Sequence, residues 1–268
     1  MDWLIGFVCA AAVAGAAFYK RSLTLSGMCA AVIMGTVYYG AGNAFWFGTL
    51  LLFFITSTLF SKWKSHRKAE LEKSYAKSGR RDAGQVMANG GLGMLVCLAN
   101  WFWPDPLWAY LFIGIMASVT ADTWATEWGG LSRRPPRSVL TWRVLPAGTS
   151  GGVSWLGSTA AAAGAILIGI GAWLLPQLDG HSGESLGLWM AAGGLGGLTG
   201  AFTDSILGAS LQRMYRCPVC GREVEVPLHC GQPTEHMRGI VWMSNDAVNL
   251  LSSLAGGLIA LWIGFMAA

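Results

Sequence analysis

The sequence predicts an all-α integral membrane protein, a polytopic helical bundle with about eight transmembrane helices. Of its 268 residues, 53% are hydrophobic and only 12% are charged, about half the charged share of a soluble globular domain. Apolar runs of about 20 residues, the length needed to cross a bilayer, recur along the chain. Because the hydrophilic stretches between them are short, we expect residues 1–268 to form a single membrane domain, with a small loop at 211–238 inserted between the last two helices.

The expected spans follow one another with short connections. The first lacks a basic start and a clear cleavage site, so we expect it to be a span and not a signal peptide. The second and third are almost continuous, which leaves their boundary the least defined. The eight runs cover residues 3–19, 23–42, 43–61, 84–103, 107–127, 151–175, 186–210 and 239–266.

Basic residues define the expected topology. All eighteen Lys and Arg fall within residues 20–21, 62–81, 133–143 and 213–238, which are alternate loops. The positive-inside rule therefore predicts a multi-pass protein of the cell membrane with cytoplasmic basic loops and both termini outside. The formal net charge of +4 reflects this topology and suits an anionic lipid surface, without implying nucleic acid.

With this topology, polar residues of several spans reach one depth near the cytoplasmic face. Asn245, Asp246 and Asn249 are three and four residues apart and can share one helix face. Asp122 and Glu127 are roughly 140° apart on an ideal helix, so both face one site only if that helix distorts or ends near Gly129. The cluster is completed by Asn89 and Asp204.

Ionised carboxylates in a membrane need a partner, water or a cation. Mg²⁺ takes hard oxygen ligands and is usually held by one or two carboxylates plus phosphate oxygens. Asp122, Asp204 and Asp246 are therefore candidate Mg²⁺ ligands. The alternative is that each acid pairs with a basic loop residue or caps a helix.

Two neighbouring motifs suit phosphate groups. Gly148, Thr149, Ser150 and Gly151 offer hydroxyls, close backbone approach and free amides at the expected start of the sixth span. Arg80 and Arg81 precede the fourth span, where guanidinium groups can hold phosphate bidentately. The alternatives are helix packing for the glycines and membrane topology alone for the arginines.

The motif series "GRRDAGQVMANGG", "ADTWATEWGG", "GTSGGVSWLG", "TDSILGA" and "WMSNDAVN" resembles that of the membrane family that includes plant phytyl-phosphate kinase and animal transmembrane protein 19, built on the integral membrane domain of unknown function 92. The pattern of acids and glycines is more distantly similar to dolichol and phytol kinases, which use CTP. The resemblance implies transfer of a phosphoryl group from a nucleoside triphosphate, CTP above all, to a membrane-embedded prenyl monophosphate, with Mg²⁺.

The resemblance also assigns roles to residues of this chain. It implies catalytic or metal roles for the acids Asp122, Glu127, Asp204 and Asp246, although Asp204 stands where the plant enzyme has a glutamate. Ser150 replaces an acid of the glycine loop, so no role of that acid is carried over. The resemblance implies nucleotide or phosphate binding by Gly148, Thr149, Gly151, Asn245 and Asn249. The residue patterns described above add Arg80, Arg81, Asn89 and Ser150 to this set.

The loop at 211–238 contains a CxxC pair followed by further thiol and imidazole groups. In a reducing compartment such a set indicates a metal site, and its softness and spacing favour Zn²⁺ with four ligands. We expect a structural knuckle that fixes the start of the last span; free thiols are the alternative. Four ligands are expected among Cys217, Cys220, His229, Cys230 and His236.

Two other classes of function compete with the kinase. A transporter or flippase for a phosphorylated lipid carrier would need polar residues along a path to the outer face, whereas these acids gather at one end. A lipid-binding or scaffolding protein would not need three acids at one depth.

Overall fold

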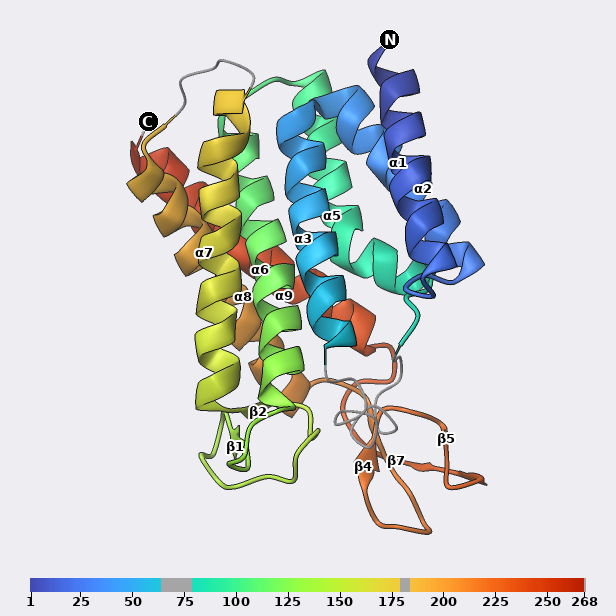
Figure 1. Cartoon of the computed structure of the whole chain (residues 1–268). Helices are drawn as coiled ribbons and strands as arrows, with labels where there is room; N and C mark the ends of the chain where they lie inside the picture. The colour runs from blue at the N-terminus through green and yellow to red at the C-terminus, as the bar shows by residue number, and fades with distance from the viewer. Residues whose placement is uncertain (64–78, 179–183, 268) are drawn as a thin grey trace.

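The computed structural model describes residues 1–63, 79–178 and 184–267 and has the expected bundle of long helices (Figure 1). Six helices in these ranges are long and apolar enough to cross a membrane. The other two long helices, α5 and α8, run beside them and are glycine-rich or polar at one end. The predicted all-α membrane bundle is therefore confirmed.

The N-terminal half consists of α1 (Asp2–Tyr19), α2 (Leu25–Val37) and α3 (Ala44–Lys62). A π-helical turn, η1 (Tyr38–Gly42), extends α2 up to Asn43, whose side chain caps α3 by accepting from the Phe45 amide at 2.9 Å. After residues 64–78 the chain resumes at α5 (Ala83–Phe102). Asp82 and Gln85 form a capping box that starts this helix.

Four further helices complete the bundle: α6 (Leu107–Gly129), α7 (Trp155–Leu178), α8 (Leu186–Ser210) and α9 (Asn245–Ala267). Two of them start later than the sequence predicted. Before α7, Gly152–Val153 forms strand β2, which pairs with β1 (Arg137–Ser138), and Ser154 then caps the helix. Before α9, Gly239 adopts a positive φ of 86° and residues 240–244 form turns.

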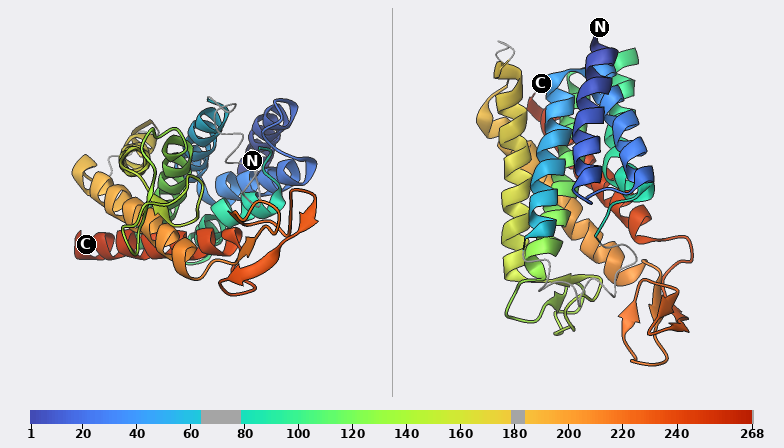
Figure 2. Two further views of the ribbon diagram at one scale, coloured as in Figure 1. Left: turned by 90° about the horizontal axis from the view of Figure 1, so that it is seen from below. Right: turned by 45° about the vertical axis from the view of Figure 1, so that its right-hand side comes forward.

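α6 lies at the centre of the bundle and packs against α3, α5, α7, α8 and α9. Seen from below, α1 and α2 stand on one side and α7 and α8 on the other (Figure 2). Every residue of α6 from Tyr110 to Ala121 is buried. Where it crosses α8 and α9, the buried Ser118 hydroxyl donates to the carbonyls of Gly114 and Gly196, and glycines allow the close approach.

The loop between α8 and α9 is not helical. It contains β3 (Met214–Arg216), β4 (Glu223–Val224) and β7 (Glu235–Arg238) in an antiparallel sheet of order β4-β3-β7, and a hairpin of β5 (Leu228–His229) with β6 (Gln232–Pro233). We call residues 211–238 the Cys/His module. Arg238 fastens it to the membrane part by donating to the carbonyls of Gly208 and Ala209 at the end of α8.

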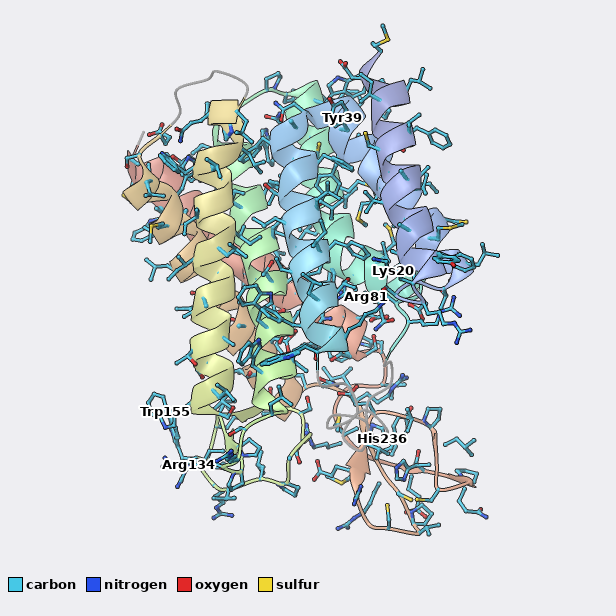
Figure 3. All side chains as sticks on the ribbon, in the orientation of Figure 1. Lys20, Tyr39, Arg81, Arg134, Trp155 and His236 are labelled. Carbon is cyan, nitrogen blue, oxygen red and sulfur yellow. The ribbon has the colours of Figure 1, made fainter. Side chains whose placement is uncertain are left out.

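The two ends of the bundle differ in charge. The described parts of the loops that follow α1, α3, α6 and α8 contain basic residues, and they lie at one end, which we call the basic end (Figure 1). Arg81, Arg134 and His236 lie toward this end and Tyr39 toward the other (Figure 3). Both termini lie at the opposite end. The arrangement agrees with the expected alternation, although much of the basic stretch 62–81 falls outside the described residues.

Candidate functional site

A cavity of about 740 Å³ opens at the basic end, between the ends of α3, α5, α6, α7, α8 and α9 and the loops that join them. Most residues that the sequence nominated line it, although they come from separate parts of the chain. These are Arg80, Arg81, Asn89, Asp122, Glu127, Gly148, Thr149, Ser150, Gly151, Asp204, Asn245 and Asn249.

The carboxylates of Asp122, on α6, and Asp204, on α8, lie close enough to repel each other. Asp204 also accepts a hydrogen bond from the Ser252 hydroxyl of α9 at 3.1 Å. Three helices thus converge on one pair of acids. Carboxylates held together in this way match the hard oxygen ligands of a divalent cation.

Glu127 lies farther along α6 and accepts a hydrogen bond from Ser61 of α3 at 2.6 Å. The sequence allowed both acids to face one site only if the helix distorts or ends near Gly129. The helix does end there, because α6 is helical only as far as Gly129. Both acids line the same cavity.

On α9 the cavity reaches two of the three nominated side chains. Asn245 and Asn249 are one turn apart and line it, whereas Asp246 is not among the lining residues. Asp246 lies in the first helical turn, where a carboxylate is favoured by the helix dipole. The expected common face therefore holds for the two asparagines.

The glycine loop lies against the end of α8. Gly148 and Gly151 have φ of 84° and 82°, values that favour glycine. A Cβ at Gly151 would lie 2.7 Å from the Cα of Ala209, so the close approach also requires glycine. The expected free amides at a helix N-terminus are not what the fold provides, because α7 begins only at Trp155 and Ser154 caps it.

The two nominated arginines differ in their contacts. Arg80 donates twice to the Leu23 carbonyl, at 3.1 and 2.9 Å, and lies over the Phe18 ring. Arg81 lies over the rings of Phe53 and Phe54, with its guanidinium carbon 5.6 and 5.8 Å from their centroids. Arg80 thus joins two chain segments, and Arg81 is the better candidate for an anion.

Sequence reasoning missed several charged residues of the cavity. The cations are Arg21, Lys62, Arg133 and Arg134, and the additional acid is Glu225. The paired arginines at 133–134 repeat the pattern at 80–81 and could have been nominated on that signal. Glu225 had no local signal, because it comes from the Cys/His module.

Glu225 is held by a short hydrogen-bonded chain. The Gln212 side chain, only 1% exposed, donates to Glu225 at 2.8 Å and accepts from the Ser150 hydroxyl at 2.9 Å. The Glu225 charge acts on both Asp122 and Asp204. Gln212 therefore connects the glycine loop, the Cys/His module and the acid pair.

The Cys/His module brings four possible metal ligands together. The ligand atoms of Cys217, Cys220, His229 and Cys230 all lie within 4.8 Å of one another. His229 Nδ1 is 3.5 Å from the Cys220 sulfur and 3.3 Å from the Cys230 sulfur. Cys230 adopts a φ of 51° in the turn of the β5–β6 hairpin, and its sulfur lies beside the imidazole of the preceding residue, His229. His236 instead packs edge-on against Tyr215, so the structure selects four of the five candidates.

Local hydrogen bonds favour a thiolate in this cluster. The pKa of Cys217 is lowered to about 6, first by a hydrogen bond from the Cys220 backbone amide and also by His229. The pKa of Cys230 is raised, first by desolvation and then by the neighbouring Cys220 and Cys217. A cation among the three sulfurs would relieve that repulsion, since the thiolate is the metal-binding form.

Comparison with known families agrees with this architecture. The family described as Integral membrane protein DUF92 matches residues 8–257. The chain belongs to the DUF92 family. The family predicted from the motif series is thus confirmed, and no solved structure matches the chain.

Relatives of this DUF92 chain occur in plants and archaea. Protein PGR of Arabidopsis thaliana is 30% identical over 90% of this chain and 89% of its own length. An uncharacterized membrane protein of Methanocaldococcus jannaschii is 29% identical over 91% of this chain and 87% of its own. Protein VTE6, chloroplastic, of Arabidopsis thaliana is 21% identical over 93% of this chain and 67% of its own. The similarity covers nearly the whole DUF92 bundle.

Proposed function

We propose that the protein is a kinase that transfers a phosphoryl group from a nucleoside triphosphate to a prenyl monophosphate in the membrane, with CTP as the expected donor. The observation that carries the proposal is the cavity at the basic end, which gathers acids, cations and a glycine loop where a phosphate group anchored in the bilayer can reach them. The motif series that resembles plant phytyl-phosphate kinase supports the same chemistry.

In the proposed reaction, a phosphate oxygen of the lipid attacks the γ-phosphorus of the nucleotide. A new P–O bond forms as the bond to the β-phosphate oxygen breaks, so the products are a prenyl diphosphate and a nucleoside diphosphate. The acceptor is already anionic at neutral pH, and no general base is needed. The protein's task is alignment and charge stabilisation.

The charges of the cavity divide into two roles. Asp122, Asp204 and Glu225 line the cavity and repel one another, so these residues would hold Mg²⁺, which would supply positive charge for the phosphate groups. Arg133 and Arg134 lie in the loop after α6 and Arg81 at the start of α5; they would hold phosphates from two sides. We assign the asparagines Asn89, Asn245 and Asn249 to nucleotide or phosphate contacts, and we keep Asp246 as a ligand to be tested.

The alternative is a transporter or flippase for a phosphorylated lipid. The position of the acids favours the kinase, because the described carboxylates that line the cavity lie at the basic end. We place that end in the cytoplasm and both termini outside, because the basic loops share it. The membrane would be the cell membrane.

The kinase proposal predicts a product that can be measured directly. Protein reconstituted in liposomes is incubated with prenyl monophosphates, Mg²⁺ and each nucleoside triphosphate in turn, and prenyl diphosphate is quantified by mass spectrometry. We expect diphosphate to form only with nucleotide and Mg²⁺, and fastest with CTP. Movement of the lipid phosphate between leaflets without nucleotide, and without diphosphate, would favour the transporter instead.

We further propose that the Cys/His module binds one structural Zn²⁺ through Cys217, Cys220, His229 and Cys230. Three thiols and one imidazole form a tetrahedral ligand set for zinc. Elemental analysis of the purified protein should give about one equivalent of zinc, which Cys217→Ser is expected to remove. Cys29→Ser, at an exposed cysteine of α2, is the matched control and should retain the metal. Equal zinc content in both variants would contradict the assignment.

A further inference from the structure

The polar cavity continues into an apolar one. A second cavity of about 50 Å³ lies between α1 and α2 on one side and α3 and α5 on the other. It shares Arg81, Gln85 and Asn89 with the polar cavity, so these residues form the join. We call the second cavity the tail groove.

We propose that the tail groove binds the isoprenoid units nearest the phosphate of the lipid substrate, and that Arg81 and Ser22 hold that phosphate at the join. This deepens the proposed kinase function and rests on it for the nature of the lipid. Three features of the join and the groove support it: an unsatisfied hydroxyl, a stacked guanidinium and an apolar space left open by small residues.

Ser22 is the first of these features. Ser22 lines the polar cavity, the residue is only 6% exposed, and none of the residues that the structure describes accepts from or donates to its hydroxyl. A buried hydroxyl without a partner is costly. The next residue, Leu23, is fully buried and lines the tail groove. Two consecutive residues therefore line the two cavities, as an amphiphile that extends from one cavity into the other requires.

Arg81 is tied to the same segment. Its amide donates to the Ser22 carbonyl at 2.9 Å, and its carbonyl accepts from the Thr24 amide at 3.0 Å. The guanidinium lies over Phe53 and Phe54, an arrangement that fixes its plane. Among the described residues, none accepts a hydrogen bond from it, and the opposing charge that acts on it is that of Glu127. Its N–H groups can therefore serve a phosphate beside the Ser22 hydroxyl.

The walls of the tail groove favour a hydrocarbon chain. Met34, Phe47 and Phe53 are apolar and buried, and small residues on the facing helices leave the space between them. An added Cβ at Gly35 would lie 2.7 Å from the Cβ of Ala10, so the wall is already at its closest approach there. A cavity lined by such groups excludes water and accepts apolar ligands.

We expect the groove to lie beside the lipid phase. Only 22% of the membrane-spanning stretch of α1 and 28% of that of α3 is buried within the protein. α3 packs mainly on α6 and α7, and α1 packs mainly on α2. The enclosed volume suits part of a chain, and the remaining isoprenoid units would extend between these helices into the bilayer. A substrate could thus enter sideways with its phosphate kept at the basic end.

The test measures lipid binding without nucleotide. Binding of a prenyl monophosphate to the detergent-solubilised full chain is followed by native mass spectrometry. A parallel measurement adds inorganic phosphate as a competitor of the lipid. Ala31→Phe fills the groove from α2, and Ile33→Phe, 63% exposed on the same helix and outside the groove, is the matched control. Val13→Phe fills the groove from α1 and replaces Ala31→Phe if that variant fails to fold.

We expect Ala31→Phe to weaken binding about tenfold or more, since displacing two buried methylene groups already has that effect, and Ile33→Phe to bind normally. Ser22→Ala and Arg81→Gln should each weaken binding by about tenfold or more through loss of a hydrogen bond to a charged group. Displacement by inorganic phosphate alone would show that the head group, and not the tail, dominates, and would overturn the groove. Equal binding by all variants would overturn it as well.

The two proposals can fail separately. If the lipid binds in the groove as expected but no nucleotide yields diphosphate, the kinase function fails and the groove stands. If Ala31→Phe forms diphosphate at the normal rate, and that rate depends on substrate concentration as in the unchanged protein, the kinase stands and the groove fails.

Discussion

Asp122→Asn and Asp204→Asn are each expected to lower Mg²⁺-dependent diphosphate formation by about a hundredfold or more, because a lost charged ligand weakens transition-state stabilisation by several kcal/mol. Asparagine keeps the size of the side chain and removes its charge. Both acids lie on buried helices in one cavity and repel each other, so losing one charge should favour folding and disfavour the cation. The measurement is initial rate against Mg²⁺ concentration in liposomes.

Asp105→Asn serves as the control for these variants. Asp105 lies between α5 and α6 at the end opposite the cavity and accepts from the Leu107 amide, which asparagine can also do. Its rate should equal that of the unchanged protein. If Asp122→Asn and Asp204→Asn retain a near-normal rate and Mg²⁺ dependence, the acids are structural and the proposed metal site is wrong. Asp246→Asn, measured alongside, decides whether that acid belongs to the site.

Gly196→Ala is expected to destabilise the bundle by about 1–3 kcal/mol, the usual range for overpacking a close-packed interior. A Cβ at this position of α8 would lie 2.8 Å from the Gly256 carbonyl oxygen of α9 and 3.2 Å from the Gly114 Cα of α6. Both neighbours are backbone atoms and cannot rotate away. The midpoint of thermal unfolding in detergent should fall.

Gly187→Ala, in the first turn of the same helix, is the matched control. Nothing lies within 4 Å of the added Cβ, so it should leave the midpoint unchanged or raise it slightly through better helix propensity. A fall as large as that of Gly196→Ala would mean that the loss of glycine itself, and not the crossing with α9, determines stability.

The sequence predicted the bundle because helices that cross a membrane need long apolar runs, and these runs are visible in the sequence. Long apolar runs and alternate basic loops indicated the helices, and the shared depth of Asp122, Asp204 and Asn249 indicated one end as the site. The residues at which helices start were predicted less well. Residues 151–153 and 239–244 contain enough apolar or small side chains to extend a span, yet strand pairing and turns hold them outside α7 and α9.

Other parts of the site depend on tertiary contacts that no local pattern records. Glu225 reaches the cavity because Gln212 holds it, and the choice of His229 over His236 follows from the turn at Cys230. The expected helix N-terminus at the glycine loop was wrong because β2 intervenes. Ser22 gave no signal, since an unsatisfied hydroxyl is visible only once its neighbours are in place.

The burial of α6 has a consequence for how the protein is made. Its apolar window has a mean hydropathy of 1.2 and is 67% buried, against 1.6 and 22% for α1. Its main partners α7, α8 and α9 are synthesised after it. A nascent chain that ends before α7 would leave Asp122 without the helices that enclose it, and a carboxylate exposed to lipid is costly. We therefore expect α6 to pack stably only after the C-terminal helices have been made, and truncated chains to be recognised and degraded by the quality control of the membrane.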